Sequence, residues 1–180
     1  NALWCEEHLD LFSTEQQAFI SPFIQSFKVL QPTYKAFRKG VVHNDVNDNN
    51  IIVSEDLRDP IVTSIIDFGD AVHTQTINDL AITLAYAIMD KNDTLAAAGE
   101  VIKGYHESFN LLEEEISALH TLVAMRLIIT VTKAALNKEA EPENTYHQIS
   151  ERAAWNALEH WSQVNAEFAT YYFRNSCGFD

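Results

Sequence analysis

The sequence predicts an α+β fold that is mainly α, with a small β element of two to four strands. Two β-branched runs, 51–53 and 61–66, flank a polar segment at 54–60, a pattern that is typical of a hairpin. From Ile77 onward, apolar residues recur at the helical spacing of three and four. With 180 residues, 47% of them hydrophobic, the chain is long enough for one sizeable core.

Helices are expected on both sides of the hairpin. Ser13 and Gln16 have the spacing of a capping box and predict a helix start. Pro22 and Pro32 are expected to kink or divide this helix, and Gly40 to end it. After the hairpin we expect helices over 77–88, about 94–109, about 112–137 and about 149–172, with a loop at 139–144 between the last two.

Charge and cysteine content limit the partners and the compartment. The chain carries 12 Lys and Arg against 26 Asp and Glu, a net charge of −14, which disfavours nucleic acid and anionic membranes. Cys5 and Cys177 show no metal-ligand spacing and no disulfide framework, so a cytoplasmic location is expected. The most apolar segment, 122–136, is short for a bilayer and contains Arg126 and Lys133, which indicates a core helix.

The segment from His43 to Asn50 contains the most informative pattern. Asp45 is followed five positions later by Asn50, and Asp67 opens an Asp-Phe-Gly turn. Phosphoryl transfer from a magnesium nucleotide uses an Asp that accepts the proton of the acceptor hydroxyl, and an Asn and an Asp as metal ligands. Because one loop enters the hairpin and the other leaves it, we expect the two loops to lie within a few ångströms of each other.

This pattern, His43-x-Asp45-x4-Asn50 with the segment 66–70, resembles the aminoglycoside phosphotransferase and choline-kinase-like superfamily. The longer segment 66–87 is similar to its hydroxylysine-kinase-like branch, which includes domains fused ahead of a class-III aminotransferase. The resemblance implies Mg²⁺ with ATP or GTP as cofactor. It also implies roles for five residues: Asp45 as the catalytic Asp, Asn50 and Asp67 as metal ligands, His43 as a brace of the loop, and Asp79 as its anchor.

Other acidic residues are candidates for contacts with an acceptor. Asp48 lies inside the loop and Asp70 follows the Asp-Phe-Gly turn, so either could contact the substrate or the residues that hold it. The acidic charge is compatible with a cationic, amine-bearing acceptor such as an amino alcohol. Further candidates in the helical part are Asp90, Asp93, Glu107 and Glu113 to Glu115.

The resemblance also implies a domain organisation. The chain corresponds to the C-terminal lobe of a protein-kinase-like phosphotransferase, with active-site loops and strands at 41–70 and a helical subdomain at 77–175. No glycine-rich loop and no Val-Ala-x-Lys strand precede residue 41. We therefore expect the N-terminal nucleotide lobe to lie outside this sequence, and the isolated chain to have weak catalytic activity or none. A downstream aminotransferase domain is a candidate neighbour.

The expected function is transfer of the γ-phosphoryl group of ATP or GTP to a hydroxyl of a small, amine-bearing metabolite. The alternative is a nucleotide-sensing or structural pseudokinase domain of a multidomain enzyme. A protein kinase is disfavoured, because a helical stripe follows the Asp-Phe-Gly turn within about ten residues and no Ala-Pro-Glu motif is present. A metal-dependent hydrolase would require a His-rich or multi-carboxylate cluster, which the sequence does not show.

Overall fold

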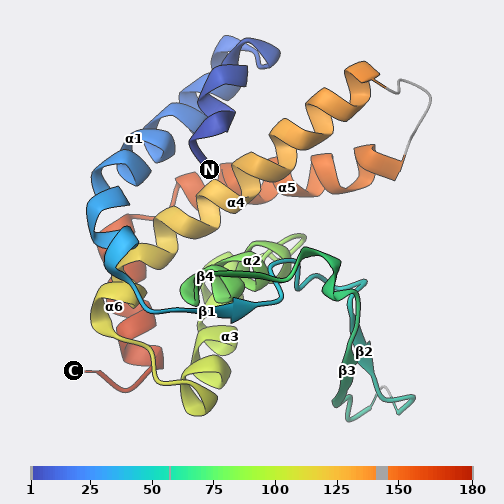
Figure 1. The fold of residues 1–180 in the computed structure, drawn as a ribbon, viewed down its shortest axis with the longest axis vertical. Helices are drawn as coiled ribbons and strands as arrows, with labels where there is room; N and C mark the ends of the chain where they lie inside the picture. Colours follow the sequence, from blue (N-terminus) through green and yellow to red (C-terminus); the bar gives the residue numbers. More distant parts are fainter. Residues whose placement is uncertain (1, 57, 141–145, 180) are drawn as a thin grey trace.

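The structure is a computed structural model that describes residues 2–56, 58–140 and 146–179. It is a mainly helical α+β fold with two small two-stranded sheets, as the sequence predicted (Figure 1). A short helix η1 (Ala2–Leu11) precedes the long helix α1 (Thr14–Ala36). The strands and the remaining helices follow in that order.

Helix α1 begins as predicted but continues further than expected. The Ser13 hydroxyl accepts from the Gln16 backbone N–H at 3.2 Å, and the Gln16 side chain accepts from the Ser13 N–H at 3.0 Å, which completes the capping box. The helix runs without interruption through Pro22 and Pro32 and ends at Ala36, so the expected division is wrong. Four buried side chains hold this helix against the core and outweigh the hydrogen bonds lost at proline: Ile20, Phe23, Ile24 and Phe27.

Four strands in the described part of the chain form two antiparallel pairs. The predicted hairpin is confirmed, with β2 (Ile51–Val53) paired to β3 (Val62–Ile65). The second pair joins β1 (Lys39–Val42) to β4 (Val72–Gln75), and β4 was not predicted. A single turn of helix, η2 (Phe68–Asp70), lies between β3 and β4.

From Ile77 onward the described residues form five helices, one more than expected. They are α2 (Ile77–Ala87), α3 (Thr94–Ser108), α4 (Glu113–Ala140), α5 (Tyr146–Ser162) and α6 (Ala166–Ser176). The helix expected at 149–172 is divided, because Asn165 caps a new helix by accepting from the Phe168 N–H at 2.9 Å. The expected loop at 139–144 begins later, since α4 runs to Ala140, and 141–144 lie outside the described residues.

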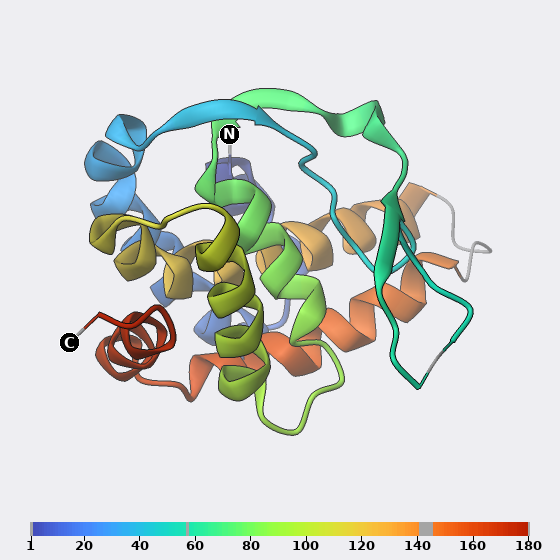
Figure 2. The same ribbon diagram turned by 90° about the horizontal axis from the view of Figure 1, so that it is seen from below.

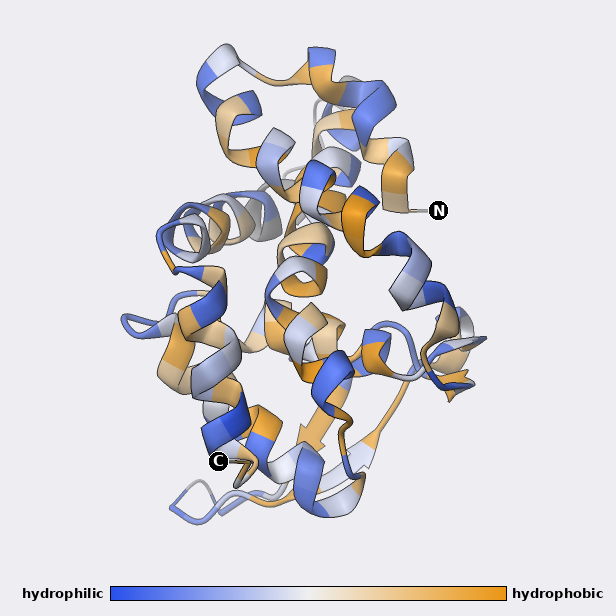
Figure 3. Cartoon of the chain, turned by 90° about the vertical axis from the view of Figure 1, so that its left-hand side faces the viewer, coloured by the Kyte–Doolittle hydropathy of each residue, from blue (hydrophilic) through white to orange (hydrophobic). Residues whose placement is uncertain are grey.

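Helix α4 is the centre of the core. It contacts η1, α1, α2, α5 and α6, and apolar segments of the helices face one another in the interior (Figure 3). By length and composition its Glu113–Lys138 stretch could cross a membrane, but 61% of its most apolar window is buried inside the protein. This burial supports the prediction of a core helix.

The β2–β3 hairpin projects from the body of the protein, away from the C-terminus (Figures 1 and 2). Large apolar side chains on the hairpin and the turn after it are exposed, including Val62 at 62% and Phe68 at 64%. The others in this region are Ile52, Val53, Ile61, Ile65, Ile66 and Val72. A patch of this kind on a small protein is typical of a surface that another part of the protein, or a partner, covers.

Candidate active site

The loop after β1 is fixed by a left-handed residue and a carboxylate. Asn44 has φ of 68°, a conformation that Asn tolerates better than other non-glycine residues. Its backbone N–H donates to Oδ1 of Asp79 at 2.9 Å, and Asp79 lies in the first turn of α2. The structure therefore places Asp79 where a residue that anchors this loop would lie.

His43 connects the loop to the end of β3. Its Nε2–H donates to the Ile66 carbonyl oxygen at 2.8 Å, and its Nδ1 accepts from the Asp45 N–H at 3.4 Å. Together these two bonds define the neutral Nε2–H tautomer. The ring is buried and lies 4.7 Å from the ring of Phe68, centroid to centroid. His43 thus holds both motif segments and is not directed at a reacting group.

Asn50 and Asp67 lie at neighbouring strand ends. The Ile66 N–H donates to the Asn50 carbonyl oxygen at 3.0 Å, which continues the β2–β3 pairing into both loops. Asn50 is buried, and its Nδ2 donates to the Asp45 carbonyl oxygen at 2.9 Å. Asp67 is exposed, has φ of 61°, and accepts from the Gly69 N–H at 3.3 Å through Oδ1.

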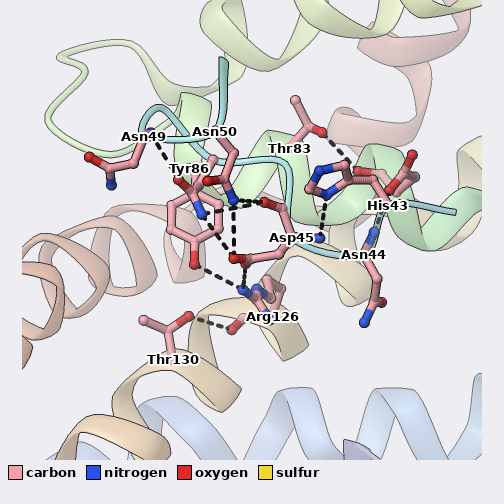
Figure 4. A network of polar contacts seen from close by, with 11 residues as sticks. His43, Asn44, Asp45, Asn49, Asn50, Thr83, Tyr86, Arg126 and Thr130 are labelled. Atoms are coloured by element: carbon pink, nitrogen blue, oxygen red, sulfur yellow. Dashed lines mark hydrogen bonds and ion pairs between the residues drawn. The ribbon is translucent and has the colours of Figure 1, made fainter. Parts of the chain in front are cut away.

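The Asp45 carboxylate is held by side chains from α4 and from its own loop (Figure 4). Its Oδ1 accepts from Nη2 of Arg126 at 2.8 Å, and its Oδ2 accepts from Nδ2 of Asn47 at 3.0 Å. The same Nη2 donates to the Tyr86 hydroxyl at 2.9 Å. The side chains of Asp45 and Arg126 are 27% and 15% exposed, so the ion pair is largely shielded from solvent. Asp45 therefore has a fixed orientation.

Arg126 and Tyr86 were not among the residues predicted from sequence. Arg126 comes from α4, 81 positions after Asp45, and Tyr86 comes from α2. One signal was present: a cation inside an otherwise apolar core helix needs a partner, because an unpaired buried charge is costly. The identity of that partner depends on tertiary packing and could not be read from the sequence.

The remaining acidic candidates are separated by the structure. Asp48 is exposed and lines a cavity of about 790 Å³, together with Tyr86 and Asp90. Asp70 is exposed, and its carboxylate makes no hydrogen bond or ion pair with the described residues. Three candidates in the helical part have structural partners: Asp93 caps α3, Glu113 pairs with Arg174, and Glu115 pairs with Arg38.

Asn50 and Asp67 are the side chains of the two loops that could hold a metal ion. No group of three or more His, Cys, Asp or Glu side chains gathers as a metal site in the described ranges. Asn50 uses its Nδ2 to bond Asp45, which leaves its amide oxygen for a ligand, and the Asp67 carboxylate is exposed beside it in the fold. Mg²⁺ usually takes one or two protein oxygens and completes its shell with phosphates and water.

Comparison with known proteins places this arrangement in a class. Residues 2–115 match the phosphotransferase enzyme family, and the chain belongs to that family. Hydroxylysine kinase from Xenopus laevis is 32% identical in an alignment of 154 residues that covers 81% of this chain and 41% of the relative. Hydroxylysine kinase from Danio rerio is 30% identical in an alignment of 151 residues that covers 82% of this chain and 42% of the relative.

Homoserine kinase from Zymomonas mobilis is a further relative, 35% identical in an alignment of 101 residues that covers 53% of this chain and 30% of that protein. The chain spans about two fifths of the length of the hydroxylysine kinases that it matches. The family assignment, with this similarity to hydroxylysine kinases, confirms the resemblance found in the motif.

Proposed function

We propose that the chain is the catalytic lobe of a phosphotransferase that moves the γ-phosphoryl group of ATP or GTP to a hydroxyl of a small, amine-bearing metabolite of the hydroxylysine or amino-alcohol type. The observation that carries the proposal is the Asp45 carboxylate, oriented by Arg126 and Asn47 and joined through Asn50 to the loop of Asp67. The similarity to hydroxylysine and homoserine kinases supports an acceptor that bears both an amine and a hydroxyl.

In this proposal Asp45 binds the acceptor hydroxyl and takes its proton as the bond to phosphorus forms. Asn47 and Arg126 keep the carboxylate oriented while the proton moves. Asn50 and Asp67 would hold magnesium through their side-chain oxygens, and the bound ion would neutralise charge on the transferred group. His43 and Asp79 fix the loop that carries Asp45, and Asp48 and Asp70 remain candidates for substrate contacts.

The exposed apolar side chains of the β2–β3 hairpin support the proposal of a further, nucleotide-binding lobe. We propose that the rest of the protein supplies a lobe with a phosphate-binding loop and a Lys, and that it covers the apolar side chains of β2 and β3. The short span of the chain relative to the hydroxylysine kinases is consistent with this organisation. A cytoplasmic location and a downstream aminotransferase domain belong to the same proposal.

The test is nucleoside diphosphate release by the protein that carries both lobes, with magnesium and a panel containing 5-hydroxylysine, ethanolamine, choline and homoserine. The proposal predicts release that depends on one class of acceptor and on Asp45. Binding of magnesium nucleotide without release for any acceptor would instead favour a nucleotide-sensing or structural pseudokinase domain.

A further inference from the structure

A cavity of about 530 Å³ lies next to the Asp45 loop, between η1, α1, α2 and α4. Asn44 and Arg126 line the end that adjoins Asp45, and Arg126 contacts the Asp45 carboxylate directly. Lys133 also lines the cavity, seven positions after Arg126 and therefore two turns further along the same face of α4. We call this space the Arg126 pocket. It adjoins the Asp45 loop through Asn44 and Arg126 and extends along α4.

The charge of the Arg126 pocket is opposite to that of the chain. Three of the 12 Lys and Arg residues line it, namely Lys35, Arg126 and Lys133, and its lining contains none of the Asp and Glu residues that the structure describes. In a chain with 26 acidic residues, such a lining concentrates positive charge at one place. Lys35 and Lys133 form no ion pair with a carboxylate in the described ranges. The pocket therefore suits an anionic group.

Arg126 has hydrogen-bond donors that the protein does not use. Both of its side-chain hydrogen bonds, to Asp45 and to Tyr86, come from Nη2. Its Nε is buried and has no partner among the described residues. A buried donor without an acceptor costs about 1–3 kcal/mol, and such groups in native structures are commonly satisfied by water or a ligand. Arg126 therefore keeps side-chain donors that are not committed to Asp45 or Tyr86.

We propose that the Arg126 pocket binds the carboxylate of the acceptor, so that the substrate class is hydroxylated amino acids and not simple amino alcohols. The inference rests on the proposed function, since it assumes that the acceptor hydroxyl lies at Asp45. The Gln31 amide, which also lines the pocket, supplies a further donor for the same carboxylate. Arg126 is then a positioning residue that contacts Asp45 with one nitrogen and orients the acceptor with its remaining donors.

The first experiment measures binding to the 180-residue chain, without any turnover. Trp4 lines the pocket, so its fluorescence can report occupancy, and Trp4→Phe serves as the blank for the two other tryptophans. The ligands are 5-hydroxylysine, its decarboxylated analogue 1,5-diaminopentan-2-ol, and inorganic phosphate. We expect 5-hydroxylysine to bind at least tenfold more tightly than the diamine, because a hydrogen bond to a charged group contributes about 1.5–3 kcal/mol.

Matched lysine variants on α4 locate the binding site. Lys133→Gln removes a cation that lines the pocket, and Lys138→Gln removes an exposed cation from the same helix outside it. We expect about tenfold weaker binding of 5-hydroxylysine to Lys133→Gln, and no change in Lys138→Gln. Equal binding of 5-hydroxylysine and the diamine, or equal effects of the two variants, would overturn the proposal. If inorganic phosphate binds tenfold more tightly than 5-hydroxylysine, the proposal is overturned, and the pocket is instead a site for the transferred phosphoryl group.

Turnover in the two-lobed protein separates failure of the pocket from failure of the proposed function. We expect Lys133→Gln to raise KM for 5-hydroxylysine about tenfold and far more than KM for the diamine, and Lys138→Gln to leave kcat and KM for both acceptors unchanged. Equal kcat/KM for the two acceptors would refute the carboxylate site while leaving the kinase activity established. Carboxylate-dependent binding without turnover of any acceptor would support the pocket and refute the proposed function.

Discussion

The Asn44 N–H donates a hydrogen bond to the Asp79 carboxylate, and this bond supports the loop that carries Asp45. A single substitution at Asp79 removes it. In Asp79→Ala, the 2.9 Å bond to a carboxylate is lost, which costs about 1.5–3 kcal/mol. The loss of an acidic group from the first turn of α2 adds about 0.3–1 kcal/mol. Together the two losses amount to about 2–4 kcal/mol, which for a chain of this size lowers Tm by about 4–16 °C.

Asp79→Ala should affect turnover as well as stability. Asn44 has φ of 68°, and without its acceptor the backbone can relax toward negative φ and move Asp45. A displacement of about 1 Å at a reacting group lowers the rate about 100-fold, so we expect that loss in kcat of the two-lobed protein. Thermal unfolding of the chain and turnover of the two-lobed protein measure the two effects.

Asp93→Ala is the matched control, because Asp93 accepts a backbone N–H at the same 2.9 Å but caps α3 away from the Asp45 loop. We expect it to lower Tm through loss of a helix cap, at a cost of about 1 kcal/mol, without a comparable loss of kcat. Asp79→Asn retains an acceptor oxygen and should recover part of the turnover. If Asp79→Ala and Asp93→Ala have the same kcat, the assignment of Asp79 as an anchor is refuted.

Three further predictions concern the scaffold. Arg38→Met leaves the Glu115 carboxylate, which is 1% exposed, without its cation. We expect the free energy of unfolding to fall by about 2 kcal/mol, a value that is reduced because Arg38 is partly exposed. Denaturant unfolding that shows no loss of stability would contradict this prediction. Gly99→Ala places a Cβ 2.6 Å from a ring carbon of Tyr172 in α6 and should destabilise the folded protein by about 1–3 kcal/mol. Gly104→Ala, in open space on the same helix, should stabilise by about 0.5–1 kcal/mol, and equal effects would refute the packing account. Burial lowers the pKa of His120 in the folded protein. As the pH falls, the His120 imidazole is therefore protonated at a higher pH in the unfolded chain than in the folded protein. Stability attributable to His120 should therefore decrease below about pH 6.5, by up to about 1.4 kcal/mol per pH unit, and the pH profile of His120→Phe should lack this component.

Local patterns were sufficient to predict the elements that position the motif. The β-branched runs predicted the β2–β3 hairpin, and Ser13 with Gln16 predicted the start of α1. The continuation of α1 through Pro22 was not predictable, because it depends on buried contacts that outweigh the local preference of proline. The division between α5 and α6 was missed because no Gly or Pro marks it, although Asn165 offered a capping signal.

For the candidate site, the sequence predicted the residues of the two loops but not the side chains that surround Asp45. Asp45, Asn50 and Asp67 lie within one short stretch of chain, where spacing and strand order are informative. The contact of Arg126 with Asp45 joins residues 81 positions apart and follows from the packing of α4 beneath the loop. The Arg126 pocket is likewise formed by four helices distant in sequence, so its positive lining is visible only in the folded chain.

The most direct test of the central claim is phosphoryl transfer by the two-lobed protein with magnesium nucleotide and 5-hydroxylysine, wild type against Asp45→Asn. The account predicts acceptor-dependent release of nucleoside diphosphate and a phosphorylated acceptor for the wild type. It predicts a loss of about 100-fold or more in Asp45→Asn, because that variant keeps the shape of the side chain but cannot accept the proton. Unchanged turnover in Asp45→Asn would contradict the assignment of Asp45 as the catalytic residue.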